Sequence, residues 1–257
     1  MQIFAIQKWL ATAVVTAVCV VKTMSVEGST NVYSGIEDLA EARKALVEGR
    51  WQEAAELGEA AGTAMGLALA AEALSIYAYY VLPEANRLEL LQRAIELSEK
   101  AVQLQPSDPW VRFQLAHAVG RYAQSIPMIK ALAEGYVSRS RQLAEEVLAL
   151  DSEMVYALLQ LGSWHIEVVL KASPLVARIT YGASVNNALE HYERALKLAE
   201  ADIVVYAEVG RGLLSLNRRK HGTRAKELLR QAADLEPRDA FEGIRRQFAI
   251  EKLEENR

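Results

Sequence analysis

The chain has 257 residues but only one cysteine, Cys19, and only 7% of its residues are aromatic. A single cysteine cannot form an intramolecular disulfide or a structural zinc site, which excludes a disulfide-stapled domain and a zinc finger. The formal net charge is only −4, whereas 51% of the residues are hydrophobic. Disordered chains combine low hydrophobicity with high net charge, so this composition predicts a folded protein with much apolar surface to bury.

The first 25 residues differ from the rest, because they contain no acidic residue and only two basic ones, Lys8 and Lys22. Between these lysines, Trp9 to Val21 is an uninterrupted stretch of apolar and small residues. An apolar core of this length is typical of a secretory signal, whereas a membrane-spanning helix needs about 20 residues. We therefore predict a signal peptide or N-terminal membrane anchor over residues 1–25, a linker over 26–35 and one domain over 36–257, exported to a bacterial periplasm or envelope.

Cys19 lies in this apolar stretch, where a bacterial lipoprotein carries its lipid-modified cysteine. Val18 before it and Val20 after it fit that processing pattern poorly, so an ordinary signal-core cysteine is favoured and lipidation is the alternative. Removal of the leader near residue 25 would leave 27 basic and 33 acidic residues. This acidic balance argues against a nucleic-acid partner, which would require a basic surface.

Proline placement and apolar spacing predict helices throughout the body of the chain. Proline disfavours helix interiors, so the six prolines indicate boundaries between roughly twelve helical segments: Pro83, Pro106, Pro109, Pro127, Pro174 and Pro237. Within residues 88–104, apolar and small residues from Leu91 to Leu104 recur every three or four positions and form a stripe along one helix face. No β-strand alternation persists, so the predicted fold is all-α.

Two segments of the body repeat the same small-residue pattern. The spacings of seven and five residues that separate Ala94, Ala101 and Pro106 recur in Ala225, Ala232 and Pro237. These positions resemble the second helix of the tetratricopeptide repeat (TPR) family, where alanine allows close helix packing. The resemblance implies a solenoid of antiparallel helix pairs, with residues 239–257 as a capping helix.

The predicted repeats are longer than the standard TPR unit. Ala116, Gly162 and Gly210 resemble the small residue of each first helix, but they lie 46 and 48 positions apart, against about 34 in the standard unit. We therefore expect repeats with lengthened helices or connections.

A more specific resemblance covers residues 154–237. The order Gly162-x-Trp164, then residues 177–184, then Ala188-Leu189-x-x-Tyr192-x-x-Ala195 looks like the helical core of the regulator of microtubule dynamics proteins and of bacterial secreted TPR relatives. The resemblance implies the same fold. It carries no catalytic motif, and nothing else in the sequence points to microtubules.

The sequence contains no motif for catalysis, nucleotide binding or metal binding. The four histidines are far apart and form no H-x-x-x-H pair, and no phosphate-binding glycine loop occurs. Gly58, Gly62 and Gly66 lie four positions apart in a helical stretch, which indicates close helix packing. We therefore expect a non-enzymatic protein without cofactor or metal.

The small-residue register predicts which side chains face the concave surface of the solenoid. They are Trp110, Phe113, His117, Arg121, Tyr156, Ser163, Glu167 and Arg211. Aromatic and arginine residues dominate binding energetics, which favours a protein or peptide partner. For Trp110 and Phe113, packing in the core between repeats is the alternative.

Two functions remain open from the sequence. The first is a scaffold that binds a protein or peptide on an open concave face. The second is a small-molecule (solute) binding component associated with a transporter, which would require an enclosed cavity of about 300–1,000 Å³.

Overall fold

The computed structural model describes residues 39–172 and 174–255, and these residues form helices without a β-strand. The predicted leader, its Cys19 and the linker lie outside the described residues. The first described helix covers 39–47. It is followed by α2 (Trp51–Ala60), α3 (Ala64–Ile76), the π-helical turn η1 (Tyr77–Val81), the 3-10 turn η2 (Glu84–Asn86), α4 (Leu88–Leu104), α5 (Pro109–Ser125), α6 (Met128–Ala133), α7 (Tyr136–Leu150), α8 (Val155–Lys171), α9 (Pro174–Tyr181), α10 (Val185–Leu198), α11 (Ile203–Leu216), α12 (Arg218–Asp234) and α13 (Ala240–Glu254).

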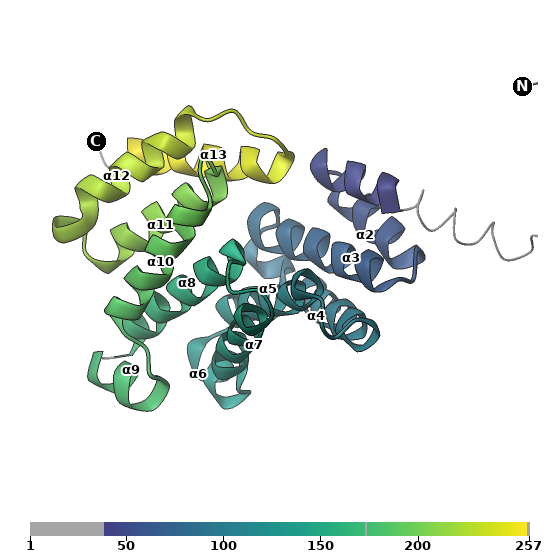
Figure 1. Ribbon diagram of the computed structural model, residues 1–257, viewed down its shortest axis with the longest axis horizontal. Coiled ribbons are helices and arrows are strands. Elements are labelled where there is room, and N and C mark those ends of the chain that lie inside the picture. Colours follow the sequence, from purple (N-terminus) through teal and green to yellow (C-terminus); the bar gives the residue numbers. More distant parts are fainter. Residues whose placement is uncertain (1–38, 173, 256–257) are drawn as a thin grey trace, which may run out of the picture.

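The helices pack pairwise along the chain, as expected for repeats. Close pairs are α2 with α3, α4 with α5, α5 with α7, α8 with α10, and α11 with α12. The short helices α6 and α9 are inserted between the members of two of these pairs, α5–α7 and α8–α10. These insertions explain why the repeat spacing exceeds that of the standard unit. The helices follow one another around an arc, and α13 returns to lie near the N-terminal helices (Figure 1).

Local sequence signals fix the helix ends. Pro109 starts α5 behind the capping side chain of Asp108, and Pro174 starts α9, so the boundary role predicted for proline is confirmed there. The helix predicted over residues 88–104 matches α4. One detail is wrong: Leu104 does not continue the buried stripe, because it is the last residue of α4 and is 61% exposed.

Small residues set the distance between paired helices. A Cβ atom on Gly58 of α2 would lie 2.6 Å from the carbonyl oxygen of Gly66 in α3. The two helices therefore cross with their backbones in contact, which confirms the close packing predicted from these glycines. The helical stretch is interrupted, however, because Gly62 lies in the left-handed turn between α2 and α3. The alanines of the repeat pattern, Ala94, Ala101, Ala225 and Ala232, are all fully buried.

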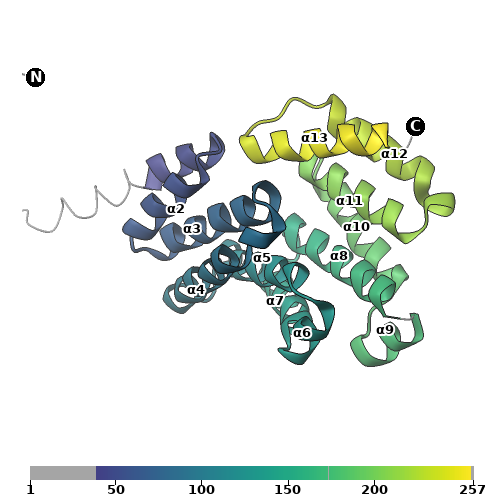
Figure 2. The same ribbon diagram turned by 180° about the vertical axis from the view of Figure 1, so that it is seen from behind.

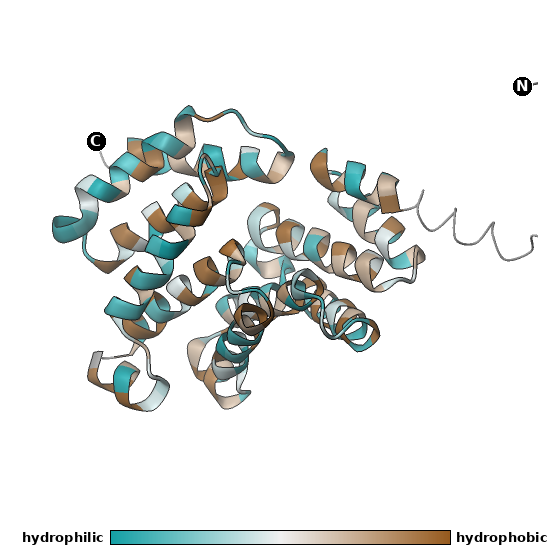
Figure 3. Cartoon of the chain, in the orientation of Figure 1, coloured by the Kyte–Doolittle hydropathy of each residue, from teal (hydrophilic) through white to brown (hydrophobic). Residues whose placement is uncertain are grey.

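Helix α3 is the central core helix of the N-terminal half. Ala64–Val81 is the one stretch in the described part of the chain that is long and apolar enough to cross a membrane by length and composition. Two-thirds of it is buried inside the fold, however, and α3 packs against α2, α4 and α5. Figure 3 shows its apolar residues next to those of its neighbours.

Helix α13 caps the C-terminal end of the solenoid, as predicted, but it also contacts the opposite end. It packs on α11 and α12 and buries Ala249 there. Its first turn places the ring of Phe241 4.9 Å from the ring of Tyr80, between centroids. Ala240 also approaches Gly49, in the turn after the first described helix. The two ends of the solenoid therefore meet, and Figure 2 shows the same approach from behind.

Candidate functional site

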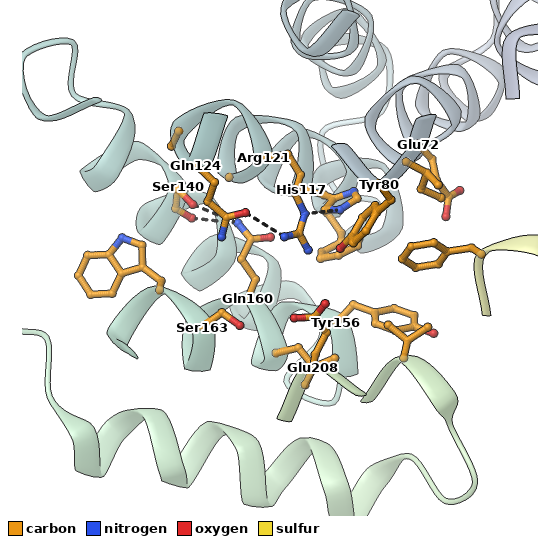
Figure 4. A pocket seen from close by; sticks show the side chains of 18 of the residues that line it. Glu72, Tyr80, His117, Arg121, Gln124, Ser140, Tyr156, Gln160, Ser163 and Glu208 are labelled. Carbon is orange, nitrogen blue, oxygen red and sulfur yellow. Dashed lines mark hydrogen bonds between the residues drawn. The ribbon is translucent and has the colours of Figure 1, made fainter. Parts of the chain in front are cut away.

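The concave side of the solenoid contains a cavity of about 260 Å³. Its lining comes from the helix over 39–47, from α2, α3 and η1, from α5 to α8, and from α11 and α13. Figure 4 shows the polar side chains that converge on it. This geometry lies between an open concave face, expected for a peptide-binding scaffold, and an enclosed cavity, expected for a solute-binding protein. Helix α13 bridges the concave face, but the volume is slightly below the usual range for small-molecule sites.

Six of the eight predicted inward residues line this cavity: Phe113, His117, Arg121, Tyr156, Ser163 and Glu167. Trp110 is not among the lining residues and packs instead against the main hydrophobic core, so the core interpretation holds for it. Phe113 belongs to that core as well as to the cavity lining, so both interpretations apply to it. Arg211 lies behind the wall, where its Nη2 donates to Ser163 Oγ at 3.4 Å and its Nε donates to Glu208 at 3.0 Å.

Arg121 is the central cation of the cavity. Its Nε donates to His117 Nε2 at 3.1 Å and its Nη1 donates to Gln124 Oε1 at 2.9 Å, while its guanidinium lies 4.7 and 5.1 Å from the ring centres of Tyr79 and Tyr80. Burial, together with the charge of Arg121, lowers the pKa of His117 to about 3, so the imidazole is neutral and can accept this hydrogen bond. Among the described residues, no carboxylate lies within 4.0 Å of Arg121.

Gln160 adds a free acceptor to the same cavity. Its Nε2 donates to the carbonyl oxygen of Ala116 at 2.8 Å, which fixes the orientation of the amide. Its Oε1 is buried and receives no donor from the described residues. The Arg121 guanidinium, which forms no close ion pair in the described part of the chain, suits an anionic group of a ligand. The Gln160 Oε1 suits an N–H or O–H group of the same ligand.

Glu208 is the buried carboxylate of the cavity wall. Arg245 Nη2 lies 2.7 Å from its Oε1, and Arg211 approaches from the other side. Burial alone would raise the pKa of Glu208, but Arg245, Arg211 and Arg121 together hold this pKa well below its usual range. Three arginines therefore act on this one carboxylate and keep it ionised.

Glu72 lies where α3 faces α13 across the cavity. It is the one charged residue of α3, and an isolated carboxylate in an apolar helix is the sequence signal that points to it. Burial and the nearby Asp239 raise the pKa of Glu72 to about 7, although Arg43 opposes the shift. Glu72 is therefore partly protonated near neutral pH.

Glu72→Gln should change how stability depends on pH. Below about pH 4.5 Glu72 is protonated in both the folded and the unfolded state, so its burial costs no stability. As the pH rises to about 7 the folded state must hold a buried carboxylate, and the free energy of unfolding falls. We expect the variant to unfold like the parent at pH 4 and to be more stable by up to about 3 kcal/mol at pH 8. Urea unfolding at both pH values measures the difference, with exposed Glu89→Gln as the control. A difference that does not change with pH would contradict the burial of a titrating Glu72.

Metal-binding side chains do not gather in the described ranges, where no group of three or more histidine, cysteine, aspartate or glutamate residues could hold an ion. Cavity residues that the sequence did not predict include Glu72, Tyr80, Gln160, Glu208 and Phe241. Tyr80 and Phe241 come together because α13 returns to the N-terminal helices.

A solved structure has a fold similar to that of this chain. The fold is similar to that of a thermophilic TPR protein from Thermus thermophilus, with a TM-score of 0.60 and 17% sequence identity over 84% of this chain and 98% of that chain. The chain is therefore a TPR-like all-α solenoid, which confirms the predicted fold class. No family model matches the sequence, and no curated protein matches it either.

Proposed function

We propose that the protein is a non-enzymatic scaffold that holds a short segment of a protein partner in the concave cavity. The observation that supports this function best is the position of Arg121, which faces a cavity walled by aromatic side chains. Its guanidinium has no carboxylate within 4.0 Å in the described part of the chain, although Glu208 acts on it from farther away. Arginine and aromatic side chains dominate the energetics of such sites. The TPR-like fold in general suits protein interaction.

The size and chemistry of the cavity restrict the ligand. A volume of about 260 Å³ admits only a few residues, so we expect a turn or a short tip of the partner chain. An anionic group would lie against Arg121, and an N–H group would donate to Gln160 Oε1. The aromatic rings of Phe113 and Tyr156, 6.1 Å apart between centroids, would cover an apolar side chain.

Peptide-display selection on the purified protein tests this proposal. The affinity of the selected peptides is then measured for the parent, for Arg121→Met and for the control Arg112→Met. Arg112 lies on the same helix, but it pairs with Glu146 at 2.6 Å outside the cavity. We expect Arg121→Met to weaken binding about 10- to 100-fold and Arg112→Met to change it less than about twofold. Failure to enrich any peptide, or equal losses in folded forms of both variants, would contradict the proposal.

A small solute with an anionic group is the second candidate, for a component associated with a transporter. The contact of Phe241 with Tyr80 supports it, because a concave face closed in this way surrounds a ligand on several sides. A panel of small carboxylic acids would then raise the melting temperature of the parent but not of Arg121→Met. If no carboxylic acid of the panel shifts the melting temperature, the result would favour a peptide ligand over a small solute.

We also propose export to a bacterial periplasm or envelope. The support is the apolar stretch Trp9 to Val21 between Lys8 and Lys22. Cleavage near residue 25 would remove Cys19, the only cysteine, so the mature protein would take up no thiol-alkylating reagent in an intact-mass spectrum. A full-length mass with one alkylated thiol would contradict cleavage.

A further inference from the structure

The inserted helices α6 and α9 expose apolar side chains at one edge of the molecule. Both helices lie at the edge opposite α13, in Figure 1 and again from behind in Figure 2. The three most exposed large hydrophobic residues in the described ranges are found here: Ile129 at 82%, Ile179 at 74% and Leu175 at 68%. Leu132 and Leu170 are exposed beside them. We call these five residues, together with Lys130, Lys171 and Arg178, the α6–α9 edge.

Helices α6 and α9 bury a small side chain and expose bulky ones, whereas a helix that packs on a core normally buries its bulky apolar residues. In α6 the buried residue is the small Ala131, and in α9 it is the small Ala177. The bulky Ile129 and Ile179 point to solvent instead. Single exposed apolar residues are ordinary, but bulky residues gathered on two insertions indicate a surface that is covered in use.

Basic side chains accompany these apolar residues. Lys130 follows Ile129, Lys171 follows Leu170, and Arg178 precedes Ile179. The lysines pair only loosely, with Glu134 at 3.9 Å and with Glu167 at 3.6 Å, and such exposed pairs contribute little. Aliphatic residues interleaved with lysine and arginine are typical of helices that lie in the interface of a membrane.

We infer that the α6–α9 edge docks on an anionic phospholipid bilayer. The isoleucines and leucines would enter the acyl boundary, while the longer basic side chains reach the lipid phosphates. A second copy of the chain fits less well, because pairing two such edges would bring like charges together. The inference does not rest on the proposed function, and of the residues of this edge only Lys171 also lines the cavity.

Amide hydrogen exchange on the full chain tests this docking. Because the predicted leader could hold the protein on vesicles by itself, the measurement must report on individual segments. We expect mixed phosphatidylcholine and phosphatidylglycerol vesicles to slow exchange about fivefold or more in residues 128–134 and 174–182, while α12 is unchanged. Pure phosphatidylcholine vesicles should have a smaller effect, because each cation near an anionic surface contributes to binding.

Two variants complete the test. The double variant Ile129→Ser/Ile179→Ser should lose the vesicle-dependent slowing, whereas Leu104→Ser, at an exposed leucine outside this edge, should keep it. All of these side chains are exposed, so both variants should fold like the parent. Exchange that vesicles do not slow at the edge would overturn the inference. Slowing without vesicles that grows with protein concentration would also overturn it and assign the edge to a second copy of the chain.

Discussion

Glu208→Gln is expected to lower the free energy of unfolding by about 3–5 kcal/mol, because it leaves the buried Arg245 and the partly buried Arg211 without their shared carboxylate. Glu208 and Arg245 are both almost fully buried, and their charged atoms lie 2.7 Å apart. The Arg245 guanidinium also lies 5.1 Å from the ring centre of Tyr80, so the loss would loosen α13 from the N-terminal helices as well.

The effect of Glu208→Gln should depend on pH. The folded-state pKa of Glu208 is depressed, so the stability it contributes is present above about pH 4.5 and is lost as the pH falls toward its folded-state pKa. Glu193→Gln is the matched control, because Glu193 pairs with Arg224 on the exposed surface, with Nη2 and Oε2 2.8 Å apart. We expect the control to cost less than about 1 kcal/mol in denaturant unfolding. Equal costs for the two variants would contradict the account of the buried arginine cluster.

Gly162→Ala is expected to destabilise the fold by about 3 kcal/mol through overpacking. A Cβ at this position would lie 2.4 Å from two ring carbons of Tyr192, whose side chain is almost fully buried. Gly212 of α11 meets the other side of the same ring, so Tyr192 of α10 occupies a slot between two glycines and cannot move away freely.

Gly243→Ala provides the control for this prediction. Gly243 lies inside α13, and a Cβ there would meet no atom within 4 Å. Alanine favours helix over glycine, so this variant should be neutral or more stable by up to about 1 kcal/mol. Thermal and denaturant unfolding measure both variants. A neutral Gly162→Ala would show that the contact between α8 and α10 is looser than described.

Much of the fold could be predicted from the sequence, because short-range signals carry it. Prolines set helix ends, and the spacing of Ala94 and Ala101 repeats in Ala225 and Ala232, which all face helix seams. The excess length between repeats was visible too. That this extra length forms the inserted helices α6 and α9 could not be predicted, because short amphipathic insertions lack a repeating pattern.

The site was only partly predictable. The small-residue register placed the α5 residues Phe113, His117 and Arg121 on the inward face, since spacings of four keep residues on one helix face. The same register failed for Trp110, which lies at the start of α5 and packs into the core. Contacts such as Tyr80 with Phe241 join residues from opposite ends of the chain, and no local pattern specifies them.

Site-specific photocrosslinking in the native host tests most directly whether the concave cavity is the binding site. A photoreactive phenylalanine derivative replaces Tyr156, which lines the cavity, or Leu104, which is exposed outside it. We expect a discrete protein adduct from position 156 that Arg121→Met removes, and no such adduct from position 104. An adduct from position 104 alone, or one from position 156 that Arg121→Met leaves unchanged, would contradict it.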